Sequence, residues 1–488
     1  MLGERPNVLW ICTDQQRFDT IGALGNQHVS TPNVDRLVEE GVAFTHAYSQ
    51  CPICTPSRAS FLTGMYPSAV HVNGNGNSHF TGRWPLVTKT LADAGYDCGL
   101  IGKLHLASAY RRIEPRADDG YRYWQYSHAP RDDWPQGHDY ADWVRSKGAV
   151  LGELTKDRDG VPAEFHQTTW CAEKTIEFIG QEREGPWLAS VNIYDPHPPF
   201  NPPKEYRDMF DPEEMPGALW QESDLEQQRI LGVTDFQSVG QHPDDLDIRS
   251  PIIPVSPGVA EEDIPGHRDA KTLQAAYYAM IKLIDDQVGR MLEALEATGQ
   301  RERTVVIFTS DHGETLGDHG LIQKGCRFYD GLVRVPLIFS CPGKFERGLR
   351  SDALVELTDK TPTLLELAGL PIPKTMQGRS LLPILTGQTD PSRFRDFVRS
   401  EYYDALDSSF CRAQDGTYAT MFRDQRHKLV VYHGHQVNEL YDLENDPNEF
   451  NNLWNDPGHQ PLKLDLMQRS FDESILAHDW GPERIGPM

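Results

Sequence analysis

Short apolar runs alternate with helical periodicity along most of the chain, and this alternation is its main structural signal. The runs at residues 8–13 (VLWICT) and 304–310 (TVVIFTS) are too short for typical helices and are rich in β-branched residues. Strands are therefore predicted at Val8–Thr13, Ala43–Ser49, Cys98–Ile101, Trp187–Tyr194, Thr304–Ser310 and Val335–Ser340.

Segments with helical periodicity lie between these runs. Some begin with a helix-starting signal, such as Thr31-Pro32. Strands separated by helices favour a mostly parallel sheet with helices on both faces, so the pattern predicts an α/β fold. The predicted helices are Asn33–Glu40, Pro56–Thr63, Thr168–Ile179, Thr272–Ala297 and Lys360–Ala368.

The pattern changes after Leu370-Pro371-Ile372-Pro373. Shorter strand-like runs and a terminal helix follow, which predicts a smaller antiparallel α+β domain over residues 376–488 after an α/β domain over residues 1–375. Two stretches, Ala107–Glu164 and Pro202–Arg268, have weak periodicity and are interpreted as functional loops or lids. The C-terminal elements are predicted at Phe397–Tyr403, Tyr418–Arg423, Lys428–His433 and Leu462–Leu476.

The charge balance excludes some partners. Among 488 residues, 47 Lys and Arg stand against 72 Asp and Glu, a net charge of −25. Nucleic acids and anionic membranes need clustered positive charge, so neither is an expected partner. The sequence has no run of 18 apolar residues, no signal-peptide pattern at its start and several cysteines within apolar runs, which favours a cytoplasmic protein. If such a protein acts on an anion, it needs a local cationic pocket.

The most informative stretch is residues 51–64 (CPICTPSRASFLTG). Cys51 and Cys54 could form a redox pair or half of a zinc site, but no thioredoxin-like context or second ligand pair is visible. From Cys54 the pattern is Cys-x-Pro-Ser-Arg-x-x-x-x-Thr-Gly, which resembles the signature of the formylglycine-dependent (type I) sulfatase family in the alkaline phosphatase superfamily. In that family a maturation enzyme oxidises the cysteine to formylglycine, whose hydrate supplies the nucleophilic oxygen. Cys51 lacks the Pro and Arg at these offsets, so Cys54 is the candidate.

Two predicted strands end in residues suited to bind a metal. A sulfate ester is an anionic and poor electrophile, so its attack needs charge neutralisation and an activated oxygen, and a divalent metal supplies both. Open α/β sheets place such sites at the carboxyl ends of their strands. Residues 8–13 run into Asp14-Gln15 and residues 304–310 into Asp311-His312. The resemblance implies that these four residues and the modified Cys54 bind one divalent metal.

The ligand pattern departs from that of many sulfatases, which have Asp in place of Gln15 and Asn in place of His312. Calcium prefers oxygen ligands, whereas an imidazole suits manganese, iron or zinc. Calcium is the first expectation and manganese the second. The same Asp-Gln and Asp-His pairs occur in choline sulfatase-like and phosphonate monoester hydrolase-like branches.

Three further motifs agree with the resemblance, namely Gly102-Lys103-Leu104-His105, Asp195-Pro196-His197-Pro198-Pro199 and Lys324, twelve residues after His312. The resemblance implies that Lys103 and Lys324 neutralise sulfate oxygens. His105 would take a proton from the formylglycine-derived hydroxyl to release sulfate, and His197 would protonate the leaving alkoxide. Arg58 would hold the nucleophile and the metal ligands through charge-assisted hydrogen bonds.

Asn75 lies in the glycine-rich loop His71–Asn77, about twenty residues after the candidate nucleophile. Such a loop commonly serves only as a turn, but related hydrolases place a substrate-contacting residue there. Asn75 is therefore predicted to bind substrate together with Lys103, His197 and Lys324.

The leading functional hypothesis is an alkaline phosphatase-like sulfatase that acts on a small-molecule or carbohydrate sulfate ester. The first alternative is a phosphonate monoester or phosphodiester hydrolase with the same machinery, although that branch lacks the Lys and His of Gly102–His105. The second is a non-catalytic carbohydrate-binding or scaffold protein that retains the fold. The sequence leaves open the alcohol part of the substrate and whether the chain forms a homo-oligomer.

Overall fold

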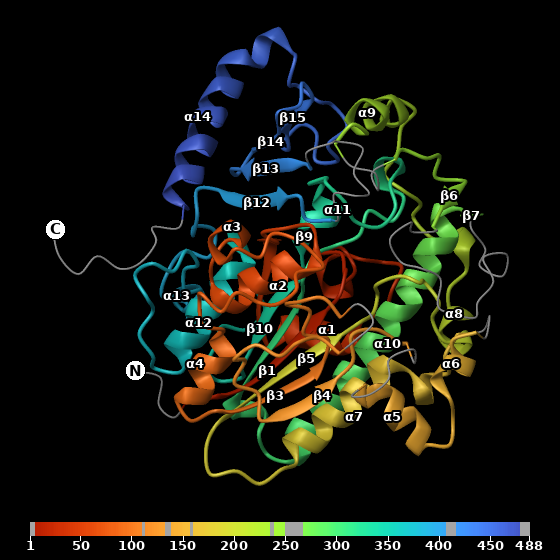
Figure 1. Ribbon diagram of the computed structural model, residues 1–488, viewed down its shortest axis with the longest axis vertical. Coiled ribbons are helices and arrows are strands. Elements are labelled where there is room, and N and C mark those ends of the chain that lie inside the picture. Colours follow the sequence, from red (N-terminus) through yellow and green to blue (C-terminus); the bar gives the residue numbers. More distant parts are fainter. Residues whose placement is uncertain are drawn as a thin grey trace.

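The central sheet is the framework of the molecule. The computed structural model describes residues 5–109, 113–131, 138–156, 160–234, 239–248, 267–406 and 416–478. Within these residues the sheet has the strand order β11-β2-β10-β8-β1-β5-β3-β4, and the short β9 also pairs with β2 (Figure 1). Its strands are β1 (Asn7–Thr13), β2 (Gly41–Tyr48), β3 (Asp97–Gly102), β4 (Tyr123–Tyr126), β5 (Trp187–Ile193), β8 (Thr304–Ser310), β9 (Arg334–Val335), β10 (Leu337–Ser340) and β11 (Leu349–Glu356).

Parallel pairing dominates the half of the sheet that carries the candidate chemistry. β1 lies between β5 and β8, with Thr13 opposite Ile193 on one side and Ser310 on the other. β3 pairs in parallel with β5 and β4, while β10 is antiparallel to both β2 and β8. The carboxyl ends of β1, β3, β4, β5 and β8 therefore meet at one edge of the sheet.

Helices cover both faces of this sheet. Successive side chains of β1 point to opposite faces and all of them are buried, so both faces must be covered. Val8, Trp10 and Cys12 pack into one core with α2, α4, α12 and α13, whereas Leu9 and Ile11 pack into the other with α1, α5, α7 and α10. The predicted α/β fold with a mostly parallel sheet and helices on both faces is confirmed. The helices are α1 (Pro32–Glu39), α2 (Cys54–Thr63), α3 (Pro67–Val70), α4 (Val87–Asp93), α5 (Asp139–Ser146), α6 (Leu151–Leu154), α7 (Gln167–Ile179), α8 (Lys204–Arg207), α9 (Ser223–Leu231), α10 (Ala270–Ala297), α11 (Asp330–Val333), α12 (Lys360–Leu367), α13 (Leu382–Leu385) and α14 (Gln460–Leu476).

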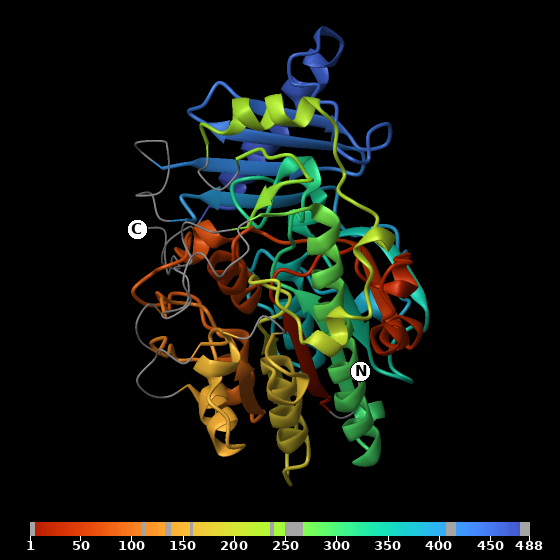
Figure 2. The same ribbon diagram turned by 90° about the vertical axis from the view of Figure 1, so that its right-hand side faces the viewer.

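A small antiparallel sheet stacks on one end of the central unit (Figure 2). One face, which includes Tyr402 and Met421, packs against Tyr48 and Ile53 of the central unit. The opposite face packs through Phe422 and neighbouring residues against Leu466 of α14. The separate C-terminal α+β unit predicted from the sequence is present, although its proposed start at residue 376 stays a prediction. Its strands are β12 (Val398–Tyr403), β13 (Tyr418–Arg423), β14 (His427–His433) and β15 (Asn438–Asp442).

The two stretches interpreted as loops or lids contain short regular elements. β4, α5 and α6 lie within Ala107–Glu164, and α8, α9 and a two-strand ribbon of β6 (Leu246–Asp247) and β7 (His267–Arg268) lie within Pro202–Arg268. These elements are mostly too short for periodicity to reveal. The remainder of both stretches includes residues outside those described.

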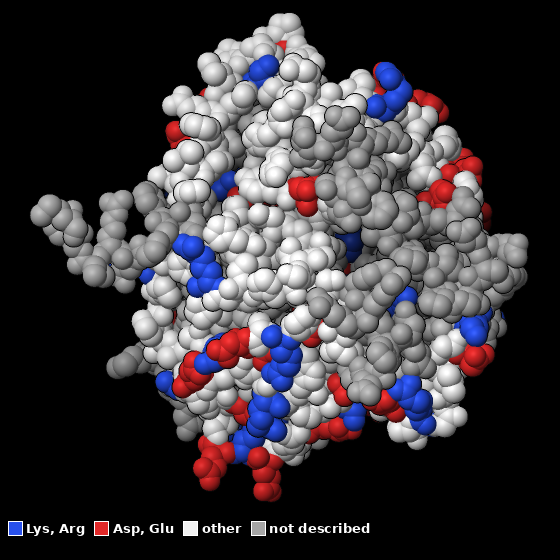
Figure 3. All heavy atoms as spheres, in the orientation of Figure 1, with Lys and Arg blue, Asp and Glu red and all other residues white. Residues whose placement is uncertain are grey.

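Charged side chains of both signs are mixed on one face of the molecule. On the face in Figure 3, Asp and Glu side chains lie among Lys and Arg side chains. Across the described ranges, every helix is too short or too polar to cross a membrane. Two cationic side chains, Lys103 and Arg58, are instead buried at the carboxyl edge of the central sheet.

Candidate active site

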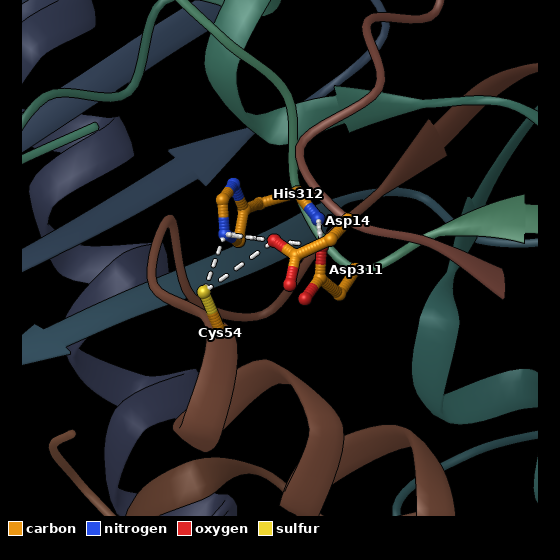
Figure 4. Close-up of side chains that lie close together, drawn as sticks. All are labelled: Asp14, Cys54, Asp311 and His312. Carbon is orange, nitrogen blue, oxygen red and sulfur yellow. Dashed lines mark hydrogen bonds and ion pairs between the residues drawn. The ribbon is translucent and has the colours of Figure 1, made fainter. Parts of the chain in front are cut away.

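Four buried side chains converge at the carboxyl edge of the sheet. Asp14 follows β1, Asp311 and His312 follow β8, and Cys54 is the first residue of α2 (Figure 4). One ligand atom from each lies within 4.8 Å of all the others. The Cys54 Sγ atom is 3.1 Å from His312 Nε2 and 3.7 Å from Asp14 Oδ1.

Two buried cations, Lys103 and Arg58, and the partly buried Lys324 surround this cluster. Lys103 Nζ lies 2.5 Å from Asp14 Oδ2, and Arg58 Nε donates to Asp311 Oδ2 at 2.8 Å. Lys324 Nζ lies 2.8 Å from Cys54 Sγ. Burial alone would raise the pKa of Asp14, but the charges of Lys103 and its neighbours hold that pKa well below the ordinary value. The arrangement gathers the local cations that an acidic chain would need in order to bind an anion.

The two cysteines of the Cys-x-x-Cys pattern have opposite environments. Burial raises the pKa of the Cys51 thiol well above its ordinary value. Burial and Asp14 act in the same direction on Cys54, but Lys324, Lys103 and His312 outweigh them and lower its pKa. The distinct cationic surroundings of Cys54 are those of a reactive cysteine.

Local backbone geometry fixes the direction of the donor atoms. The Asp311 Oδ1 atom accepts the backbone N–H groups of Gln15 and His312, at 3.1 and 2.9 Å. Gln15 has a φ of 72°, which is uncommon for a residue other than glycine and is typical of strained functional turns. The His312 Nδ1–H group lies 2.9 Å from the Gly313 carbonyl oxygen, which leaves Nε2 with its lone pair toward the cluster.

Glu314 orients Gln15, a role that the sequence analysis did not assign. Gln15 Nε2 donates to the buried Glu314 carboxylate, so Gln15 Oε1 faces Lys324 Nζ at 3.0 Å. Burial raises the pKa of Glu314, although hydrogen bonds from Leu316, Gln15 and Gln323 oppose this effect. Glu314 follows directly on the Asp-His-Gly motif, and that position is the only signal the sequence offered.

The Lys103–His105 segment reaches the site through a close backbone approach. Gly102 has a φ of 100°, and a Cβ atom there would lie 2.0 Å from the Asn192 carbonyl oxygen, so only glycine fits. His105 is buried, and burial together with Lys103 holds its pKa well below the ordinary value. A neutral imidazole of this kind suits a proton acceptor.

His197 follows β5 and is also buried. Its Nδ1 atom lies 2.8 Å from the Pro198 carbonyl oxygen, which fixes the tautomer and leaves Nε2 for proton exchange. Burial, then Lys324, hold the pKa of His197 well below its ordinary value. Both lysines and Asp14 act on it electrostatically, so it belongs to the same site.

Asn75 lies beside α2 rather than within the cluster. Its Oδ1 atom accepts the Thr55 backbone N–H at 3.0 Å, near the N-terminus of α2. Its own N–H donates to the Ala405 carbonyl oxygen at 2.8 Å, which ties this loop to the segment after β12. The described contacts of Asn75 thus fix the end of α2, and its substrate contact stays a prediction.

Arg58 joins three strand ends. Besides Asp311, its guanidinium donates to the Asn192 side chain at 3.2 Å and to the Lys103 carbonyl at 3.3 Å. Ser57, one residue earlier in α2, donates to the Asp311 carbonyl oxygen at 2.6 Å. Asn192 and Ser57 had no role in the sequence analysis, since an Asn within a strand and a Ser within a signature carry no distinct signal of their own.

The donor atoms fit a divalent cation. Two carboxylates and an imidazole nitrogen meet around position 54. The Gln15 amide oxygen lies 3.0 Å from Lys324 Nζ, which is itself 2.8 Å from Cys54 Sγ. Hydrogen bonds outside the cluster orient the amide and the imidazole. Metal sites show this organisation of ligands and supporting bonds. The mixed oxygen and nitrogen set admits both calcium and manganese.

Comparisons with known proteins agree over nearly the whole chain. The Sulfatase family model matches residues 6–370, and the model described as N-sulphoglucosamine sulphohydrolase, C-terminal, matches residues 317–474. An arylsulfatase of Clostridium perfringens is 29% identical, with 98% of this chain and 96% of the relative covered. A multifunctional alkaline phosphatase superfamily protein, PehA, of Trinickia caryophylli is 30% identical, with 97% and 96% covered. The crystal structure of a phosphonate monoester hydrolase of Agrobacterium radiobacter superimposes with a TM-score of 0.77 at 28% identity and covers 97% of this chain and 96% of its own.

The metal site can be tested with Asp14→Asn and Asp311→Asn. Each variant removes one of the two carboxylates in the cluster, so both should lose most of their bound metal by elemental analysis. A ligand that binds only the folded state raises its stability. Chelation should therefore lower the Tm of the wild-type protein and leave the Tm of both variants unchanged.

Asp285→Asn is the matched control. Asp285 is a buried carboxylate of α10 that accepts backbone N–H groups of α1, and this variant should keep its metal. Stoichiometric metal in either cluster variant would show that the ligand set is wrong.

Proposed function

The chain belongs to the sulfatase family of sulfuric ester hydrolases, and we propose that it hydrolyses sulfate esters through an oxygen nucleophile derived from Cys54. The observation that carries this proposal is the surroundings of Cys54. In a chain of net charge −25, this one side chain begins a helix beside Lys324, Lys103 and the Asp14–Asp311–His312 cluster. A site with these cations can accept an anionic ester that the rest of the protein would repel.

Maturation would convert Cys54 to formylglycine, so the Sγ atom marks where the nucleophilic oxygen of its hydrate lies. The family also implies a divalent metal, which Asp14, Gln15, Asp311 and His312 would hold together with residue 54. When bound, such a metal supplies Lewis acidity and lowers the pKa of a bound hydroxyl. We propose calcium, with manganese as the second choice.

The other residues of the pocket would bind the sulfate group and move protons. Lys103 and Lys324 would each neutralise sulfate oxygens, and Arg58 would keep Asp311 in place. His105, neutral at physiological pH because of its burial, would accept the proton of the hydroxyl at position 54 as sulfate departs. This assignment follows from its low pKa and its position after β3.

His197 would donate a proton to the leaving alkoxide. Burial and Lys324 disfavour its protonated form in the free site. A bound sulfate ester brings negative charge that offsets both lysines, which favours the imidazolium that a general acid needs. Binding of the substrate would thereby raise the pKa of His197 and favour its protonation. We propose a small-molecule or carbohydrate sulfate ester as the substrate class, with Asn75 as a further contact.

The chemical state of residue 54 can be tested directly. Mass spectrometry of the peptide that contains Cys54 should show formylglycine when the protein is made together with a maturation enzyme, while Cys51 should remain a thiol. Cys54→Ala should abolish turnover and keep the fold, with Cys51→Ala as the matched control that stays active. Substantial turnover by the Cys54 variant would contradict the mechanism.

Substrates with different leaving groups separate the roles of His105 and His197. A nitrophenolate leaves without protonation, whereas an alkyl or sugar alkoxide does not. His197→Ala should therefore lower kcat/KM for alkyl or sugar sulfates about 10²–10⁴-fold more than for aryl sulfates. His105→Ala should lower kcat by a similar factor for every leaving group, because sulfate release is common to all substrates. Equal losses for aryl and alkyl substrates in the His197 variant would pass the acid role to Lys324.

A phosphonate monoester or phosphodiester hydrolase is the second candidate function, favoured by the similarity to the Agrobacterium enzyme. Lys103 and His105 favour the sulfatase, because they add a sulfate ligand and a base for sulfate release. The matured, metal-loaded protein should have a higher kcat/KM for an aryl sulfate than for an aryl phosphonate with the same leaving group. The reverse order would support the second candidate.

A further inference from the structure

A buried carboxylate outside the catalytic set holds the backbone that carries His105. Glu114 is 2% exposed and accepts the backbone N–H groups of His105, Leu106 and Ala107, at 2.7, 2.5 and 2.9 Å. The Tyr126 hydroxyl, at the end of β4, lies 3.4 Å from the same carboxylate. One side chain thus binds the segment after β3 to the end of the neighbouring strand.

The backbone at His105 needs such support. Its φ of 57° is left-handed, a conformation that is unfavourable for a residue with a side chain. Successive N–H groups that point at one anion form a concavity suited to negative charge, and charge-assisted bonds of this kind are stronger than neutral ones. The three bonds to Glu114 therefore offset the strain where it occurs.

The hydrogen-bond partners of Glu114 suit its ionised form. Among the described residues, every hydrogen-bond partner of the carboxylate is a donor, and Arg58 is the charged side chain that favours ionisation. Burial opposes ionisation more strongly and raises the pKa of Glu114 to about 7. Protonation would turn one acceptor oxygen toward N–H groups as a donor, so these bonds weaken as the pH falls through about 7.

His105 itself does not titrate in that range. Burial, then Lys103, His128 and Arg58 lower its pKa well below the ordinary value, and Asp14 opposes them. The His128 ring, two residues beyond Tyr126, packs edge-on against the His105 ring with centroids 4.5 Å apart. Burial also lowers the pKa of His128 well below its ordinary value, which leaves Glu114 as the group of this assembly that ionises near neutral pH.

We propose that Glu114 is the positioning residue of His105, and that its ionised carboxylate keeps residues 105–107 in the conformation that sulfate release requires. The catalytic part of this proposal rests on the base role of His105 proposed above. The positioning part does not, because it concerns only the backbone of residues 105–107. A rise of kcat with pH through about 7 would then report the ionisation of Glu114.

The variant Glu114→Gln tests the positioning part and the catalytic part. Its amide keeps one acceptor oxygen but places an NH₂ group where the second oxygen accepted a backbone N–H. Hydrogen–deuterium exchange of residues 105–107 should become at least tenfold faster than in the wild type at pH 8. With sulfate esters, kcat should fall on the order of 10²-fold by the same factor for aryl and alkyl leaving groups, the usual scale for a misplaced catalytic group. KM and metal content should change little, and the rise of kcat near pH 7 should disappear.

Asp285→Asn is the matched control, because Asp285 is another buried carboxylate that accepts backbone N–H groups and its pKa is raised to about 6. It should leave the exchange of residues 105–107, kcat and the pH profile unchanged. If Glu114→Gln fails to fold, the wild-type protein provides the test. The protection of the amides of residues 105–107 against hydrogen–deuterium exchange, corrected for the intrinsic exchange rate, should fall as the pH drops from 8 to 6.

Unchanged protection in either experiment would overturn the proposal, and so would a pH profile that persists in a folded Glu114→Gln variant. A wild-type protein that cleaves no sulfate ester would contradict the proposed function instead. The exchange measurement would then still decide whether Glu114 holds this segment.

Discussion

The structure depends on one electrostatic constraint, which is that ionised groups buried at the edge of the sheet must neutralise one another. An unpaired buried charge is strongly unfavourable, so the two cluster carboxylates can only be buried together with the buried cations Lys103 and Arg58. Asp14 pairs with Lys103, and Asp311 with Arg58. Because Asp14, Lys103 and Asp311 directly follow β1, β3 and β8, and Arg58 lies in α2, their pairing also ties the strand ends to the helix that begins with Cys54. Removal of one partner would leave the other charge uncompensated.

Strain in the backbone accompanies this concentration of charge. Gln15 and His105 have left-handed conformations, and Gly102 approaches a neighbouring strand too closely for any side chain. Strain of this kind persists only where surrounding contacts determine the conformation. Two buried carboxylates provide such contacts at the rim: Glu314 binds the Gln15 side chain, and Glu114 binds the backbone from His105 onward. The residues that support the site from outside thus include two carboxylates, and both accept hydrogen bonds mainly from N–H groups.

The sequence predicted the interior of the fold better than its edges. β8 and β13 have the predicted bounds because continuous apolar or β-branched runs mark buried strands. The edge strands β4 and β11 were not predicted, since one has four residues and the other carries Arg350, Ser351 and Asp352 with a break in register. The motif residues at the strand ends were visible in the sequence. Glu114 was not, because its partners are backbone N–H groups, which any residue type can supply, and it lies in a stretch without periodicity.

The amide at position 15 connects the edge of the Asp14–Cys54–Asp311–His312 cluster to Lys324. Gln15 Oε1 is a neutral acceptor for Lys324, whose ammonium also contacts Cys54. A carboxylate at this position would form an ion pair with Lys324 and compete with the sulfate group for its charge. In this chain a carboxylate lies behind Gln15 instead. It is the side chain of Glu314, which accepts hydrogen bonds from the Gln15 amide and from backbone N–H groups. The amide thus keeps an oxygen beside Lys324 without neutralising it, and in the proposed function it would leave the charge of Lys324 to the sulfate group.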